Sequence, residues 1–169
     1  ADFLQEVVSM DKNIPRADFP EQVGVSSKEI SALIKDVEES GIEMHSLLIL
    51  RHGKIACEAY RYPYNSKSPH TMYSVSKSFT SVAIGFAIDE GLLTLDTKVI
   101  DIFPEFRPKK FDENLEKMTV FHLLTMTAGK DVSVFSDKTK GNWVKQFFES
   151  KWAFAPGEGW RYISENTYM

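Results

Sequence analysis

The residues best suited to chemistry in this chain are Ser74 and Lys77, in the stretch MYSVSKSFTSVAIGF. In a helix, a spacing of three residues brings both side chains to one face. A serine hydroxyl is a weak nucleophile until a base takes its proton. A neutral lysine can be that base, and burial against apolar neighbours favours the neutral amine. Backbone N–H groups at a helix N-terminus would stabilise the oxyanion that forms. The pair indicates either a nucleophile with its base or a helix cap followed by a lysine that reaches solvent.

The residues behind this pair predict the element that positions it. Residues 78–90 have the length of a helix and are apolar on nearly every side. That pattern is typical of a central helix that is covered all round. Gly91 stands where such a helix would end. We therefore expect Lys77 to lie in an apolar environment.

Upstream, the sequence predicts a helix followed by a hairpin. Ser26 and Glu29 fit a capping box, and the apolar residues behind them follow the spacing of an amphipathic helix that ends near Gly41. Two strand-like runs then flank residues 51–54. They predict a β-hairpin in which Gly53 supplies the backbone freedom of the turn.

Downstream, short helices alternate with loops. Residues 118–129 predict a helix with Thr119 as its N-cap and Gly129 as its end. Residues 141–151 predict another helix with an aromatic face, whereas the charged residues 105–117 indicate a surface loop.

The composition excludes several classes of function. The chain has 169 residues, 43% of them apolar and 26% charged, which suits one globular domain with a substantial core. A net charge of -4 argues against nucleic-acid binding, which needs a basic surface. The longest apolar run, Val82–Ile88, is too short to span a membrane.

The cysteine and histidines predict no redox or metal chemistry. Cys57 is the single cysteine and alternates with apolar residues in a strand-like run, so we expect a half-buried thiol. His45, His52 and His70 lack the spacing of metal ligands, so no metal site is expected. No leader is visible in the first residues, which leaves a cytoplasmic and an extracytoplasmic location both open.

Four ordered stretches carry a resemblance to a known family. MYSVSKSFTSVAIGF contains the Ser-x-x-Lys pair, and GLLTLDTKVIDIFPE follows it. MTVFHLLTMTAGK is similar to T-I-x-x-L-L-T-H-T-S-G, with Met126 and Ala128 as departures, and FAPGEGWRYISENTY is similar to P-G-x-x-F-x-Y-S-N. Together they resemble the serine β-lactamase and penicillin-binding-protein superfamily, most of all its class C-like branch of peptidases, esterases and amide hydrolases. The resemblance covers roughly residues 45–169.

The resemblance implies a role for each matched residue. Ser74 would be the acylated nucleophile, Lys77 its base and Tyr162 the proton shuttle at the leaving group. A nearby ammonium group would lower the pKa of the Tyr162 phenol. Ser164 stands where many relatives carry asparagine and would bind the lysine or the substrate, and Tyr73 is a candidate for the substrate pocket. No metal or organic cofactor is implied.

The implied fold is α/β (α+β), with a β-lactamase-like antiparallel sheet flanked by helices. Residues 1–25 are expected to form an irregular lead-in, and residues 26–169 the N-terminal portion of a single domain. The family's third motif, Lys-Thr-Gly or His-x-Gly, does not follow Tyr162. KTKG at 138–141 precedes Tyr162 and is rejected as a match. We therefore expect the C-terminal strands of the sheet to be absent.

Two functions from different classes remain. In the first, the chain is the N-terminal portion of a serine hydrolase that forms an acyl-enzyme on an ester, amide or β-lactam carbonyl of a small-molecule or peptide substrate. In the second, it is a truncated non-catalytic module that needs a complementing C-terminal segment, or binds one through an open sheet edge. The set of Ser74, Lys77 and Tyr162 favours the first, because a binding module has no physical need for it.

Four other residues have structural explanations. Ser76 is expected to cap the helix, and His122 to pack or to anchor a loop. Trp160 is expected in the core, and Asp96 in a cap or turn. None of these residues is therefore assigned to the chemistry.

Overall fold

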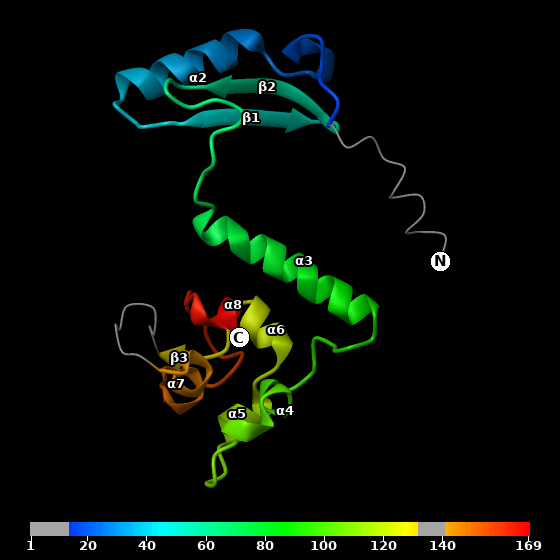
Figure 1. Cartoon of the computed structure of the whole chain (residues 1–169), viewed down its shortest axis with the longest axis vertical. Helices are drawn as coiled ribbons and strands as arrows, with labels where there is room; N and C mark the ends of the chain where they lie inside the picture. The colour runs from blue at the N-terminus through cyan, green and yellow to red at the C-terminus, as the bar shows by residue number, and fades with distance from the viewer. Residues whose placement is uncertain (1–13, 132–140) are drawn as a thin grey trace. The chain divides into compact units, whose positions relative to one another are not determined.

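The computed structural model describes residues 14–131 and 141–169 (Figure 1). The chain divides into two compact units, residues 1–71 and residues 72–169. Every residue that the sequence nominates for catalysis or substrate binding lies in the second unit. Most of the KTKG stretch, residues 138–140, lies outside the described residues.

Helix α2 of the first unit, Ser27–Glu39, follows the predicted pattern. Its N-cap is Ser26, whose Oγ accepts a hydrogen bond from the backbone N–H of Glu29 at 3.2 Å. Gly41 lies just beyond its last turn with φ 67°, a left-handed conformation that glycine adopts without a Cβ clash. The predicted start and end of this helix are confirmed.

The predicted hairpin is also confirmed. Strands β1, Ser46–Arg51, and β2, Lys54–Tyr60, pair antiparallel. His52 and Gly53 between them have φ values of 51° and 71°, which is the backbone of a two-residue turn that matches the strand twist. Cys57 on β2 is half-buried, as expected.

Part of the expected lead-in has regular structure. Residues Pro20–Val23 form the 3₁₀ helix η1, and Val23 is buried. The N–H of Ala17 donates to the carbonyl oxygen of Ile55 at 3.0 Å, so the chain before η1 pairs with strand β2. These long-range contacts left no periodic pattern in the sequence.

In the second unit, short helical segments lie around one apolar core, and the longer helix α3 contributes no buried residue to it (Figure 1). Its core residues are Val99, Ile100, Leu115, Met118, Leu123, Ala128, Phe147, Phe148 and Ile163. Its helical elements are η2 Tyr73–Val75, α3 Ser76–Asp89, α4 Val99–Ile102, η3 Pro104–Phe106, α5 Glu113–Lys117, α6 Val120–Leu124, α7 Trp143–Glu149 and α8 Glu165–Tyr168.

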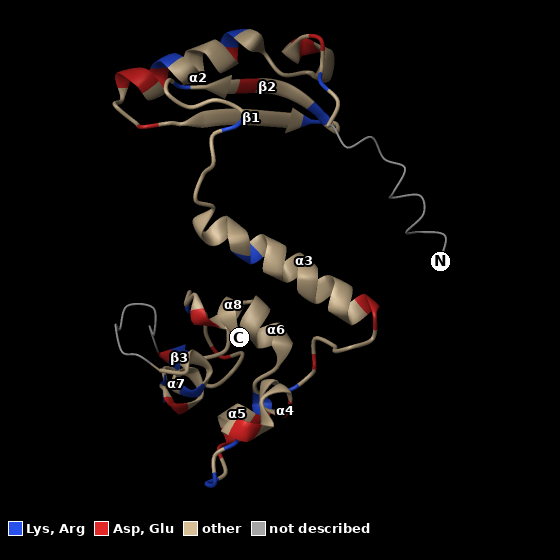
Figure 2. Cartoon of the chain, viewed as in Figure 1, with Lys and Arg blue, Asp and Glu red and all other residues tan. Residues whose placement is uncertain are grey.

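Helix α3 exists as predicted, but the expectation that it is covered all round is wrong. None of its residues is buried, and Phe79, Val82 and Phe86 are 68%, 58% and 63% exposed. Figure 2 shows it without charge along most of its length. The side of α3 that carries Lys77 and Ile84 lines a cavity shared with residues of α6 and α8, and no described element of the second unit covers the opposite side. Among the described residues no helix has the length and hydropathy that a bilayer crossing requires.

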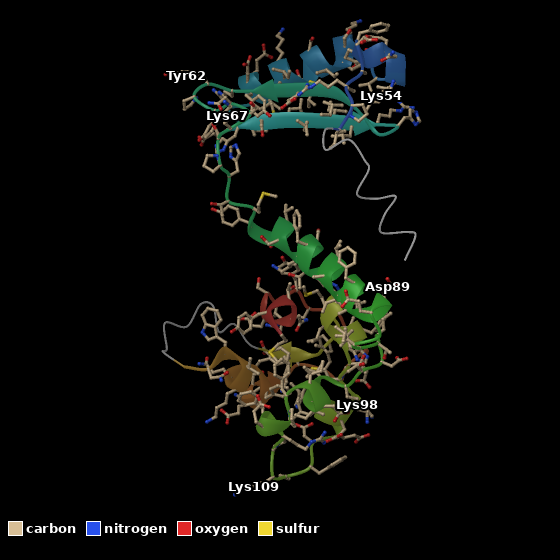
Figure 3. All side chains as sticks on the ribbon, turned by 45° about the vertical axis from the view of Figure 1, so that its right-hand side comes forward. Lys54, Tyr62, Lys67, Asp89, Lys98 and Lys109 are labelled. Atoms are coloured by element: carbon tan, nitrogen blue, oxygen red, sulfur yellow. The ribbon has the colours of Figure 1, made fainter. Side chains whose placement is uncertain are left out.

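The segment 105–117 is only partly the surface loop that its charges indicate. Lys109 lies at the outer tip of this loop and is exposed (Figure 3). The segment ends in helix α5, however, where Asp112 accepts hydrogen bonds from the N–H groups of Asn114 and Leu115 at 3.0 and 3.2 Å. Leu115 is 3% exposed and packs in the core. Burial of this one apolar side chain anchors the turn, although its neighbours in the sequence are charged.

A second small sheet was not predicted. Strand β3, Lys130–Asp131, pairs antiparallel with β4, Lys151–Trp152. Gly129 was expected to end α6, but it lies five residues beyond Leu124 and directly before strand β3. Its carbonyl oxygen accepts a hydrogen bond from the N–H of Ala153, the residue that follows β4. The φ of Gly129 is 82°, and a Cβ there would lie 2.2 Å from the carbonyl oxygen of Phe154. Glycine therefore allows the two segments to approach closely.

Candidate active site

The nucleophile candidate lies where the chain enters helix α3. Ser74 is in the 3₁₀ turn η2, which runs into α3 at Ser76. Tyr73 before it has φ 43°, in the left-handed region that residues with a Cβ rarely adopt. Such backbone strain gathers at functional sites. The N–H of Val75 donates to Met72 O at 3.0 Å, so this amide is not free for an oxyanion.

Three side chains converge on Ser74. Lys77 Nζ lies 3.1 Å from Ser74 Oγ, and Tyr162 Oη donates to the same Oγ at 2.6 Å. Lys77 Nζ also donates to Ser164 Oγ at 3.2 Å and lies 5.1 Å from the centre of the Tyr162 ring. The structure thus brings together the four residues Ser74, Lys77, Tyr162 and Ser164. Tyr73 directly precedes Ser74 in the chain and is 83% exposed.

Backbone hydrogen bonds hold the segment that carries Tyr162. The N–H of Gly157 donates to Thr127 O and that of Arg161 to Met126 O, both at 2.9 Å. The guanidinium group of Arg161 pairs with Asp131 at 2.7 Å. This ladder joins residues 153–161 to the segment that follows α6, and it fixes the phenol opposite Ser74.

The residues around Tyr162 alternate between core and site. Ile163 is 8% exposed and belongs to the core, whereas Tyr162 and Ser164 on either side of it contact Ser74 and Lys77. Trp160 shares the side of Tyr162, with ring centres 6.4 Å apart. Burial of Ile163 therefore helps to orient both polar neighbours.

The expectation that Trp160 lies in the core is wrong, because its indole is 66% exposed beside Tyr162. Ile163, not Trp160, supplies the apolar anchor of this segment. The spacing of Trp160, Tyr162 and Ser164, every second residue, is the sequence signal that would have placed the tryptophan at the site.

Once ionised, Tyr162 can accept hydrogen bonds from the Ser74 hydroxyl and from the Lys77 ammonium group, and these bonds favour the phenolate. The contact with the Ser74 hydroxyl and, next, the contact with Lys77 lower the pKa of the Tyr162 phenol below its usual value. The lowering agrees with the expectation, although the serine contributes more than the ammonium group. In the state described here Lys77 and Tyr162 both donate to Ser74 Oγ. One of them must give up its proton before it can accept that of the serine.

His122 anchors the start of α6, as expected. Its Nδ1 accepts a hydrogen bond from the N–H of Thr119 at 3.0 Å and lies 3.0 Å from Thr119 Oγ1. Burial lowers the pKa of His122, which favours the neutral ring that can accept this bond. Among the residues that the structure describes, no group of His, Cys, Asp and Glu is placed to hold a metal ion.

Sequence reasoning missed a buried lysine in the second unit. Lys130 is 1% exposed, and its Nζ donates to the carbonyl oxygens of Phe148 and Ser150 at 2.9 and 3.1 Å. The ammonium group lies 3.7 Å from the centre of the Trp152 ring. Lysine is rarely buried without partners, and no periodic pattern predicts such a set.

A family model described as beta-lactamase matches residues 30–167. The chain belongs to the beta-lactamase family. The esterase EstB of Burkholderia gladioli is 28% identical, over 68% of this chain and 36% of the esterase. A beta-lactamase of Pseudomonas fluorescens is also 28% identical, over 79% of this chain and 38% of that protein.

The structure of this chain also superposes on a solved protein structure. A Bacillus anthracis protein described as a 6-aminohexanoate-dimer hydrolase superposes with a TM-score of 0.62 at 18% identity, over 92% of this chain and 46% of that chain. The chain thus spans less than half the length of each of these three proteins. It matches part of a β-lactamase-type fold, as the sequence predicted.

Proposed function

We propose that this chain carries the acylation centre of a serine hydrolase and forms a covalent acyl-enzyme on Ser74. The observation that carries the proposal is the contact of Ser74 Oγ with both Lys77 Nζ and Tyr162 Oη, at 3.1 and 2.6 Å. A nucleophile within hydrogen-bond reach of two groups, each of which can accept its proton once deprotonated, is the arrangement that acyl transfer requires.

In the proposed reaction the Ser74 oxygen attacks the substrate carbonyl while its proton passes to Lys77 or to the Tyr162 phenolate. The lowered pKa of Tyr162 makes the phenolate more accessible. The bond from the carbonyl carbon to the leaving oxygen or nitrogen then breaks, and Tyr162 Oη protonates the leaving atom. Water hydrolyses the acyl-serine by the reverse proton path. Ser164 holds the amine of Lys77 in place through its contact at 3.2 Å.

The proposed substrates are small-molecule or peptide esters, amides or β-lactams. Relatives described as an esterase and a beta-lactamase support this range. All three substrate types share a carbonyl carbon that a serine oxygen can attack. The chemistry needs no metal or organic cofactor, because the serine is the nucleophile and the lysine and tyrosine move the protons.

Labelling with a fluorophosphonate probe followed by intact-mass measurement tests the proposal. We expect one adduct on Ser74, no adduct on the Ser74→Ala chain and strongly slowed labelling of Tyr162→Phe. Ser76→Ala is the matched control and should leave labelling unchanged, because Ser76 starts α3 two residues after Ser74 and its side chain takes no part in the hydrogen bonds that join Ser74, Lys77, Tyr162 and Ser164. A Ser74→Ala chain that is labelled as fast as the wild type would contradict the assignment.

A second candidate function is a module that acts with a complementing segment. The exposure of Phe79, Val82 and Phe86 on α3 favours it, because apolar side chains in a row on one helix are costly to leave in water. A folded chain that takes up no label at Ser74 would favour this candidate over the first.

A further inference from the structure

We propose that Trp160 binds the leaving group of the substrate, so that the enzyme prefers esters and amides with a flat, apolar leaving group. This inference rests on the proposed acyl transfer at Ser74 and adds a substrate class to it.

The exposure of Trp160 is the first observation. Its indole is 66% exposed, although tryptophan is among the side chains that gain most from burial. The indole is not isolated on a remote surface, because its ring centre lies 6.4 Å from that of Tyr162, with the two planes inclined by 41°. An aromatic platform thus stands beside the phenol that donates to Ser74.

The path of the proton decides which part of the substrate meets this platform. Ser74 Oγ forms its bond to the carbonyl carbon, and the leaving oxygen or nitrogen takes a proton from Tyr162 Oη. The leaving atom must then come within hydrogen-bond distance of Oη, about 3 Å. A substituent on that atom extends past Tyr162, and the neighbouring indole is the surface it meets. The acyl part stays on Ser74.

The charges beside Trp160 favour a neutral group. Arg161 follows Trp160 directly, but its guanidinium group is paired with Asp131 at 2.7 Å. Lys77 is engaged with Ser74 and Ser164. A flat, uncharged ring gains stacking area on the indole and does not depend on an ion pair.

Two esters with one acyl group test the inference, because both give the same acetyl-enzyme. We expect Trp160→Ala to lower kcat/KM for 2-naphthyl acetate about two- to tenfold more than for ethyl acetate, the range that an aromatic contact supplies. Trp160→Phe keeps a ring and should restore most of the loss. Phe111→Ala, at an aromatic that is 75% exposed and lines a different cavity, should affect neither ester.

Deacylation provides the second readout. The loss of acetyl from Ser74, followed by intact mass, should be the same in Trp160→Ala and wild type, because the leaving group has departed. An equal loss of kcat/KM for both esters, or a changed deacylation rate, would overturn the inference while leaving acylation of Ser74 intact. A wild-type chain that neither hydrolyses the two esters nor takes up fluorophosphonate at Ser74 would instead overturn the proposed function itself.

Discussion

The buried ammonium group of Lys130 makes the stability of the second unit depend on pH. Burial lowers the pKa of Lys130 from 10.5 to about 8, against a smaller opposing effect of Asp112. The side chain is 1% exposed, so solvent screens the ammonium group little. Its contacts with two carbonyl oxygens and the Trp152 ring offset only part of the lost hydration.

The size and sign of the effect follow from these two pKa values. The difference between 10.5 and about 8 is about 2.5 units, which corresponds to about 3 kcal/mol. Below pH 8 the lysine is protonated in both states, and the cost of burying the charge is fully present. Between pH 8 and 10.5 the unfolded state binds more protons, so the free energy of unfolding rises with pH. Above that window this contribution is constant.

Urea unfolding followed by tryptophan fluorescence between pH 7 and 10.5 measures this contribution. Lys130→Met removes the titrating group and roughly keeps its volume. The unfolding free energy of the wild type minus that of this variant should therefore rise by about 3 kcal/mol across the window. Lys151→Met is the matched control, because Lys151 is an exposed lysine on the partner strand of the same sheet. Its difference from wild type should not change in this way. A Lys130→Met difference that stays constant with pH would refute the reasoning.

Two further predictions concern the segments that hold the site. Gly129→Ala should lower the free energy of unfolding, measured by urea unfolding, by at least about 2 kcal/mol, because φ is 82° and the new Cβ would lie 2.2 Å from Phe154 O. Gly85→Ala is the control: it lies in α3 with no atom within 4 Å of the added Cβ, and it should be neutral or stabilising in the same measurement. Ser164→Ala should slow fluorophosphonate labelling about tenfold by removing the 3.2 Å contact with Lys77, whereas Ser164→Asn should largely retain the rate. Equal rates in both Ser164 variants would show that this contact does not hold the lysine.

Local pattern was enough for the α2 helix, the β1–β2 hairpin, the α3 helix and half of the candidate site. The spacing of Ser74 and Lys77 places both on one helical face whatever surrounds them, and their side chains lie 3.1 Å apart. Gly41 and Gly53 mark a helix end and a turn, because the backbone conformations needed there depend on the residue itself. The order of motifs indicated the beta-lactamase family, which the match over residues 30–167 confirms.

Tertiary contacts decided the rest. Tyr162 meets Ser74 across 88 residues of chain, through a ladder of backbone bonds that leaves no periodic signal. The apolar helix α3 is exposed and Trp160 lies beside the site, whereas the charged side chain of Lys130 is buried. The residue type sets the free energy that a side chain gains or loses on burial. Which side chains are buried depends on the neighbours that long-range packing brings to them.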